Sequence, residues 1–153
     1  MLRSILRSRV LRRTDYGGRT SQQGSQGGIL LESKEFAQLR KKLNKTQAQM
    51  AQLLGTSIKA IHSYEQGWRR VPAHAERQLY FLAARIGDHK HRKPCWVIKK
   101  CPTGQKRQCP AWEFQAGKLC WFINGTICDG MVHKDWQEKI KICRSCEVFS
   151  SVF

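Results

Sequence analysis

The stretch at residues 46–72, TQAQMAQLLGTSIKAIHSYEQGWRRVP, constrains the fold of this chain more than any other part. Thr46, with Gln49 three residues later, has the pattern of a capping box that begins a helix. Gly55 stands where a helix ends in a left-handed residue, and Ser57 can cap the helix that follows. A second glycine ends that helix. The stretch therefore predicts two short helices joined by a tight turn.

Apolar residues at helical spacing extend this pattern on both sides. Phe36, Leu39 and Leu43 predict a helix that begins near Ser33. Pro72 suits the first turn of a further helix. The apolar stripe expected in that helix consists of Ala75, Leu79, Leu82, Ala83 and Ile86. Residues 32–88 are therefore expected to form an all-α unit of four to five helices.

Two short helices with a small residue, Ala51, at their crossing have the layout of a helix-turn-helix, which places its second helix in the major groove of DNA. Residues 33–87 resemble the XRE-type helix-turn-helix family, which includes the lambdoid phage repressors and Cro. The resemblance rests on TQAQMAQLLG, on Ile61, and on the ending Glu65–Gly67 that is followed by basic residues and Pro72. It implies that this unit binds double-stranded DNA.

The resemblance also implies roles for single residues. Gln47 would contact phosphate, whereas Ile58, Lys59 and Ser63 would face the base edges. Arg69 and Arg70 would lie over the backbone. Ser57 and His62, at the start of the second helix and one turn later, complete the expected DNA-binding set: Gln47, Ser57, Ile58, Lys59, His62, Ser63, Arg69 and Arg70.

The same resemblance leads to an expected ion pair and shows two positions where this chain departs from the family. Arg40 would form a structural ion pair with Glu65. Ile58 stands where many members have Gln or Arg, so it cannot read guanine by paired hydrogen bonds, although it could contact a thymine methyl group. Trp68 is bulkier than the usual residue at its position, and we expect it to pack on the fourth helix or on the C-terminal half.

The charge of the chain supports a polyanionic partner. The sequence has 28 Lys and Arg against 11 Asp and Glu, a formal net charge of +17. Neutralising phosphates releases counterions, so such a chain favours nucleic acid, with an anionic membrane surface as the alternative. No apolar run approaches the ~20 residues of a membrane span. The sequence therefore predicts that this is not an integral membrane protein.

Residues 1–31 are expected to form a disordered basic extension and linker. An Arg-rich piece with interleaved Leu, Ile and Val precedes a Gly/Gln/Ser-rich piece with nothing to bury. A basic arm that reaches DNA and an organellar transit peptide remain alternatives for the first piece. Residues 89–94 read as a second, short polar linker.

Seven cysteines lie in residues 95–153, and they predict a small, irregular, metal-stabilised domain: Cys95, Cys101, Cys109, Cys120, Cys128, Cys143 and Cys146. Their odd number and the lack of a secretory signal favour a reducing cytoplasm over a disulfide framework. Cys143 and Cys146 have the two-residue gap common in zinc and iron–sulfur sites. The expected cofactor is zinc or a [4Fe-4S] cluster. Two clustered metals with His133 as a further ligand, or disulfide and free-thiol roles, remain open.

Residues 95–149 resemble the two-CW domain, a small bacterial module that occurs alone or attached to signalling and regulatory domains. The resemblance rests on the pairs Cys95-Trp96 and Cys120-Trp121, on CPAWE from Cys109 and on CRSCEVF from Cys143. It implies a sensory or regulatory role.

The sequence lacks the glycine-rich phosphate loop, the serine nucleophile elbow and the paired carboxylates that mark many enzymes. We therefore expect no enzyme and no small-molecule substrate. The chain reads as a bacterial, cytoplasmic DNA-binding transcriptional regulator, with a homodimer as an open alternative to a monomer. Rival interpretations are a protein-interaction adaptor that uses the helical unit and a thiol-based redox protein.

Overall fold

A computed structural model of the chain describes residues 31–87 and 92–153. The predictions for residues 1–30 and for residues 89–91 of the second linker lie outside the described residues. The N-terminal helices are α1 (Ser33–Lys42), α2 (Gln47–Leu53), α3 (Ile58–Glu65) and α4 (Ala73–Ile86). Each corresponds to a helix expected from the sequence.

The predicted helix starts and stops around the turn are confirmed. The side chain of Thr46 accepts a hydrogen bond from the backbone N–H of Gln49 at 3.2 Å, and the Gln49 side chain accepts one from the Thr46 backbone at 3.0 Å. Ser57 caps α3 by accepting from the N–H of Ala60 at 3.1 Å. Gly55 has a φ of +61°, the left-handed conformation that glycine adopts without strain. This local chemistry fixes where α2 ends and α3 begins.

The cysteine-rich part is built from short helices and one small hairpin. Its elements are α5 (Cys95–Ile98), α6 (Thr103–Arg107), α7 (Pro110–Glu113), the 3₁₀ turn η1 (Gly117–Leu119), α8 (Cys120–Ile123), β1 (Ile127–Cys128), β2 (Met131–Val132), α9 (Trp136–Arg144) and α10 (Glu147–Ser150). The strands pair antiparallel, with Ile127 opposite Val132. Asp129 and Gly130, both with positive φ, form the two-residue turn that such hairpins favour.

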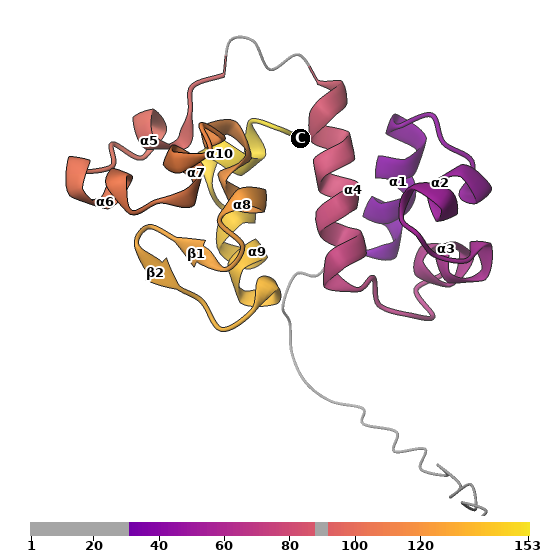
Figure 1. Cartoon of the computed structure of the whole chain (residues 1–153). Coiled ribbons are helices and arrows are strands. Elements are labelled where there is room, and N and C mark those ends of the chain that lie inside the picture. Colours follow the sequence, from indigo (N-terminus) through magenta and orange to yellow (C-terminus); the bar gives the residue numbers. More distant parts are fainter. Residues whose placement is uncertain (1–30, 88–91) are drawn as a thin grey trace, which may run out of the picture.

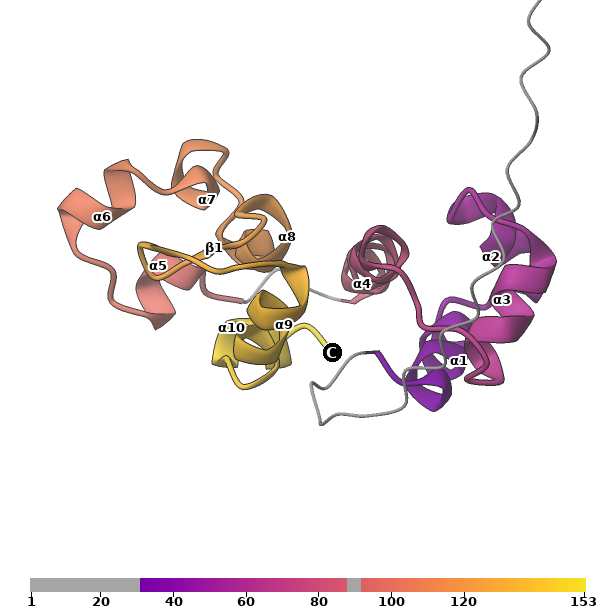
Figure 2. The same cartoon turned by 90° about the horizontal axis from the view of Figure 1, so that it is seen from below.

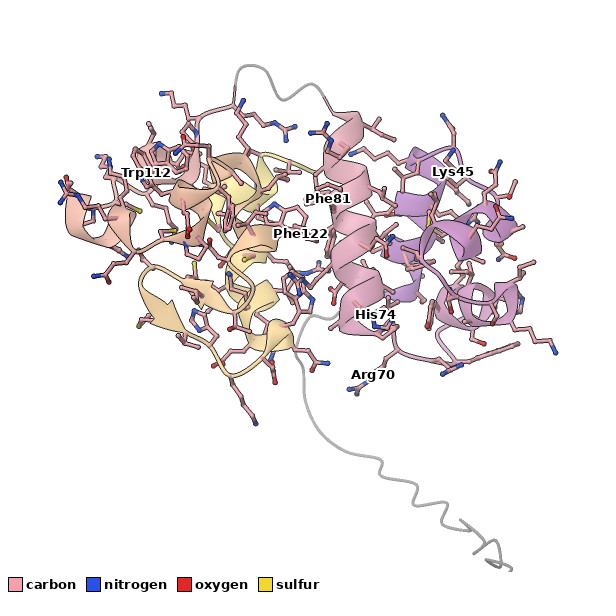
Figure 3. The ribbon with its side chains drawn as sticks, in the orientation of Figure 1. Lys45, Arg70, His74, Phe81, Trp112 and Phe122 are labelled. Atoms are coloured by element: carbon pink, nitrogen blue, oxygen red, sulfur yellow. The ribbon has the colours of Figure 1, made fainter. Side chains whose placement is uncertain are left out.

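Helix α4 lies between the other N-terminal helices and the cysteine-rich part (Figures 1 and 2). Buried side chains from both sides belong to one continuous hydrophobic core. Tyr80 of α4 contacts Trp121 and Phe149 edge to face, with ring centroids 6.2 and 5.2 Å apart. The rings of Phe81 and Phe122 stack at 4.9 Å, and Figure 3 shows them meeting across this boundary. The two regions that the sequence divides are therefore packed together along α4.

Polar contacts reinforce the same boundary. Arg77 of α4 lies 5.2 Å from the ring centroids of both Phe122 and Trp136. Arg144 of α9 donates to Glu35 of α1 at 2.8 Å and also to the hydroxyl of Tyr80. These contacts connect α9 directly to α1 and α4. None of the described helices is both long enough and apolar enough to span a bilayer.

Glu76 provides a pH-dependent test of this boundary. Its carboxylate is buried and accepts a hydrogen bond from Trp136 Nε1 at 3.0 Å. Burial raises the pKa of Glu76, and the bond from Trp136 opposes this only in part. Because the folded-state pKa is raised, the stability that Glu76 contributes is fully present below its unfolded pKa and is lost as pH rises through the folded pKa.

We expect Glu76→Gln to remove this pH dependence, since the amide oxygen can still accept from Trp136 and carries no charge. Urea unfolding of both proteins across a pH series measures the effect. The wild type should lose stability relative to the variant as pH rises above about 4.5. Exposed Glu113 provides the control Glu113→Gln. If the unfolding free energies of wild type and Glu76→Gln changed with pH in parallel, the buried carboxylate would not titrate as described.

Candidate nucleic-acid interface

Helix α3 presents one face to the core and the other to solvent. Ala60, Ile61 and Tyr64 are buried. The opposite face carries Ile58, which is 53% exposed, and the exposed Lys59. About half of this aliphatic side chain is therefore available to a partner.

The structure brings most of the expected DNA-contacting side chains together. A shallow open groove is lined by Gln47, Ile58, Lys59, His62, Ser63 and Trp68. Gln47 comes from the first turn of α2 and the others from α3 or the segment that follows it. Ser57 lies outside this lining, and its hydroxyl oxygen caps α3. The hydroxyl of Ser63 donates to the carbonyl of Lys59 at 2.8 Å.

Beneath this groove lies a charged network that fixes α3 relative to α1 and α2. Arg40 of α1 forms two hydrogen bonds with the carboxylate of Glu65, one of them at 3.2 Å from Nη2. The expected Arg40–Glu65 ion pair is therefore present. Arg40 also donates to the carbonyl of Lys45 at 2.7 Å, in the turn before α2. One guanidinium thus ties together α1, the turn and α3.

Gln47 takes part in the same network. Its side-chain amide donates to Glu65 Oε2 at 2.8 Å. Burial opposes ionisation of Glu65, but the hydrogen bonds from Arg40 and Gln47 outweigh it and hold the pKa of this carboxyl below its usual range. One N–H of the Gln47 amide is used in this way, and the amide keeps a second donor. Contact of Gln47 with phosphate remains a prediction.

Trp68 differs from the sequence-based expectation. It does not pack on α4 or on the cysteine-rich part, because it is 72% exposed. Its ring lies edge to face with His62, with centroids 5.3 Å apart. The backbone N–H groups of Trp68 and Arg69 both donate to the carbonyl of Ser63, at 3.0 and 3.3 Å, which folds this segment back onto the end of α3. The bulky residue therefore joins the exposed face of α3.

The two arginines after α3 are exposed. Figure 3 shows Arg70 next to His74 at the beginning of α4, with its side chain directed away from the ribbon. Neither Arg69 nor Arg70 makes an ion pair with a described residue. Both guanidinium groups are therefore available to an anionic partner.

The seven cysteines surround two adjoining cavities. The larger is lined by Cys95, Cys101, Cys109, Cys120 and Cys128, and the smaller by Cys120, Cys128, Cys143 and Cys146. All seven thiols are free. Among residues 31–87 and 92–153, no three Cys, His, Asp or Glu side chains are arranged as ligands of a single ion. His133 lines neither cavity.

Two of these thiols interact directly. A hydrogen bond between Cys95 and Cys120 lowers the pKa of Cys95 and, together with burial, raises that of Cys120. Burial also raises the pKa of Cys143 to about 12, against which the nearby Lys139 acts only in part. Without a bound cation, Cys120 and Cys143 are therefore neutral thiols at neutral pH.

Comparison with known proteins gives one match. Residues 36–73, from α1 to the first residue of α4, match a family model described as helix-turn-helix. No curated protein and no solved structure matches the chain. The match spans the capped turn and the whole of α3. The resemblance of the cysteine-rich part to the two-CW domain remains a prediction.

Proposed function

We propose that this chain, whose residues 36–73 match a helix-turn-helix family, is a transcriptional regulator that binds double-stranded DNA. The observation that carries the proposal is the groove where Gln47, Ile58, Lys59, His62, Ser63 and Trp68 lie together on the exposed face of α3. Arg69 and Arg70 flank it and are free of described acidic partners. This arrangement supports the proposal, because apolar and hydrogen-bonding groups can read base edges and the neighbouring cations can contact phosphates.

Each side chain then has a distinct role. Lys59 and Ser63 contact base edges, Arg69 and Arg70 neutralise phosphates of the DNA backbone, and Ile58 contacts a thymine methyl group. Gln47, at the start of α2, contacts a phosphate through the amide N–H that Glu65 does not use. The Arg40–Glu65 pair holds α3 at a fixed angle below this surface.

The decisive experiment is DNA binding as a function of salt concentration, first on mixed duplexes and then on a selected sequence. We expect a steep linear fall of the logarithm of the binding constant with the logarithm of salt concentration. Arg69→Ala and Arg70→Ala should each reduce this slope by about 1, with similar losses on all sequences. Ile58→Ala should instead weaken preference for the selected sequence.

Lys141→Ala is the matched control, because Lys141 is an exposed cation on α9, across α4 from α3. Its slope should equal that of the wild type. A slope near zero, or arginine variants that behave like the control, would contradict DNA binding through this face. The adaptor interpretation would then gain support.

We also propose that the cysteine-rich half binds a metal through thiolates, as zinc or an iron–sulfur cluster. The observation that favours it is that all seven cysteines line two cavities that share Cys120 and Cys128. Elemental analysis and visible absorption of an anaerobic preparation test this. Zinc gives no colour, whereas an iron–sulfur cluster absorbs visible light. A preparation with neither metal, which then fails to take up either, would contradict it.

A further inference from the structure

Lys139 of α9 is a buried cation without a carboxylate partner. The residue is 1% exposed, although lysine is almost never fully buried unless it is paired. Its ammonium group donates to the carbonyl oxygens of Gly125, at 3.2 Å, and Ile127. None of the ion pairs among the described residues involves Lys139. Burying an ammonium group this deeply is costly when only neutral carbonyls offset its charge.

The smaller cysteine cavity lies directly beside this ammonium group. Lys139 lines it together with Lys99 and the four thiols of Cys120, Cys128, Cys143 and Cys146. The other lining residues are apolar apart from Asn124: Trp121, Ile127, Val148 and Phe149. No described carboxylate lines the cavity. Lys99 is exposed and pairs with Asp129 at 3.6 Å, so Lys139 is the buried positive charge that faces the four sulfur atoms.

The charge balance favours a thiolate-bound cation in this place. A zinc ion held by four thiolates carries a net negative charge, and this would offset the charge of the buried Lys139, whereas Lys99 already has Asp129 as its partner. Four neutral thiols would leave Lys139 without an anion. The buried lysine is therefore explained by an anionic centre that the four sulfur atoms can form.

The size of the cavity favours one ion over a cluster. The space available to the centre of a water-sized sphere is about 20 Å³. This is room for about one water molecule. A cube of four iron and four sulfur atoms needs far more, so it would require a larger rearrangement of the cavity than a single zinc ion. The larger cavity, with about 200 Å³, lacks both Lys139 and the short Cys143–Cys146 spacing.

We propose that Cys120, Cys128, Cys143 and Cys146 bind one zinc ion in the smaller cavity and that Lys139 is its charge partner. This assignment rests on the proposed metal-binding role of the cysteine-rich half. The sulfur atoms must turn inward, because no three of them converge on one point in the described structure. Each thiol releases its proton to solvent as its sulfur binds zinc, so the exchange balances in charge.

The test uses the full-length, reduced, metal-free chain titrated with zinc alone. Bound zinc and the number of thiols protected from an alkylating reagent are counted together. We expect one zinc ion and four protected thiols. Cys143→Ser and Cys146→Ser should each abolish stoichiometric binding. Cys101→Ser should bind like the wild type, because Cys101 lines only the larger cavity. Equal loss in Cys101→Ser, or a number of protected thiols other than four, would overturn the assignment.

Lys139→Met separates a charge partner from a merely structural lysine. We expect zinc affinity to fall by about 10- to 100-fold, as for other residues that support metal ligands. The metal-free variant should unfold at the same or a higher urea concentration, since a buried charge is replaced by an apolar side chain of similar length. Unchanged zinc affinity of Lys139→Met, whatever the stability of the metal-free variant, would overturn the role of Lys139.

The outcomes also distinguish this assignment from the proposal on which it rests. If the wild type binds neither zinc nor iron, the metal-binding proposal itself fails. If the wild type binds zinc while Cys143→Ser and Cys146→Ser bind it equally well, only the choice of cavity fails. DNA binding through α3 is measured separately and is affected by neither result.

Discussion

Replacing Trp121 with alanine should lower the free energy of unfolding by about 3–5 kcal/mol and should destabilise both halves of the chain together. Trp121 is 1% exposed and lies in the core that both halves share. Its ring contacts Tyr80 of α4 at 6.2 Å and Phe149 of α10 at 5.6 Å, both edge to face. Truncation leaves a large cavity beside α4, whose other face supports α1.

Urea unfolding followed by far-ultraviolet circular dichroism and by tryptophan fluorescence measures this effect. One transition at the same midpoint is expected with both signals, because the shared core couples α4 to the cysteine-rich part. Phe114→Ala is the control, since Phe114 is an exposed aromatic residue directly after α7. Its midpoint should hardly move. Two separate transitions, with only the later part of the chain destabilised, would show that the halves fold independently.

The positions of α1 to α4 follow from local signals that a sequence displays directly. The capping box at Thr46, the cap at Ser57 and the left-handed Gly55 each act within a few residues. Their consequences do not depend on distant contacts, so helix-turn-helix geometry is predictable. The exposed face of α3 follows in turn, because burying Ile61 and Tyr64 leaves Ile58 and Lys59 outside.

The second buried face of α4 could not be predicted in the same way. The sequence pattern indicates one apolar stripe, and Leu79 and Ala83 of that stripe are indeed buried. Glu76 and Tyr80 are buried as well and form hydrogen bonds with residues 60 and 45 positions away in sequence, whereas Ile86 is exposed. A glutamate and a tyrosine on a helix read as solvent-facing until the partner surface is known.

In the cysteine-rich part, even more of the structure depends on contacts between residues that are distant in sequence. Spacing groups Cys143 with Cys146, but only the fold shows that Cys120 and Cys128 border the same cavity. Lys139 reads as one more basic residue of a basic chain, and nothing local indicates its burial. Trp68 shows the opposite case: its size predicts packing, whereas backbone hydrogen bonds to the Ser63 carbonyl hold its segment at the surface.

Replacing Arg40 with methionine should lower the free energy of unfolding by about 3 kcal/mol, because Glu65 is then left as an unpaired, largely buried carboxylate. The side chains of Arg40 and Glu65 are 15% and 9% exposed. The variant also loses the bond to the Lys45 carbonyl in the turn before α2. Helix α3 then loses its fixed angle to α1, and DNA affinity should fall more than for any single groove residue.

The pH dependence of the unfolding free energy identifies the lost Arg40–Glu65 pair as the cause of the destabilisation. Hydrogen bonds hold the pKa of Glu65 below its usual value of 4.5, so its contribution to stability is present above that value and is lost as pH falls through the folded-state pKa. Arg40→Met should lose most of this dependence. The double variant Arg40→Met/Glu65→Gln should regain part of the stability at neutral pH, since no buried charge remains.

Arg85→Met is the matched control, because Arg85 is exposed near the end of α4 and makes no described ion pair. It should leave both stability and the pH profile unchanged. Urea midpoints at neutral and acid pH, together with DNA titration of the folded variants, complete the comparison. A loss in Arg40→Met no larger than in Arg85→Met would show that the ion pair does not hold α3. The position of the DNA-reading surface would then depend on the apolar contacts of Ile61 and Tyr64 alone.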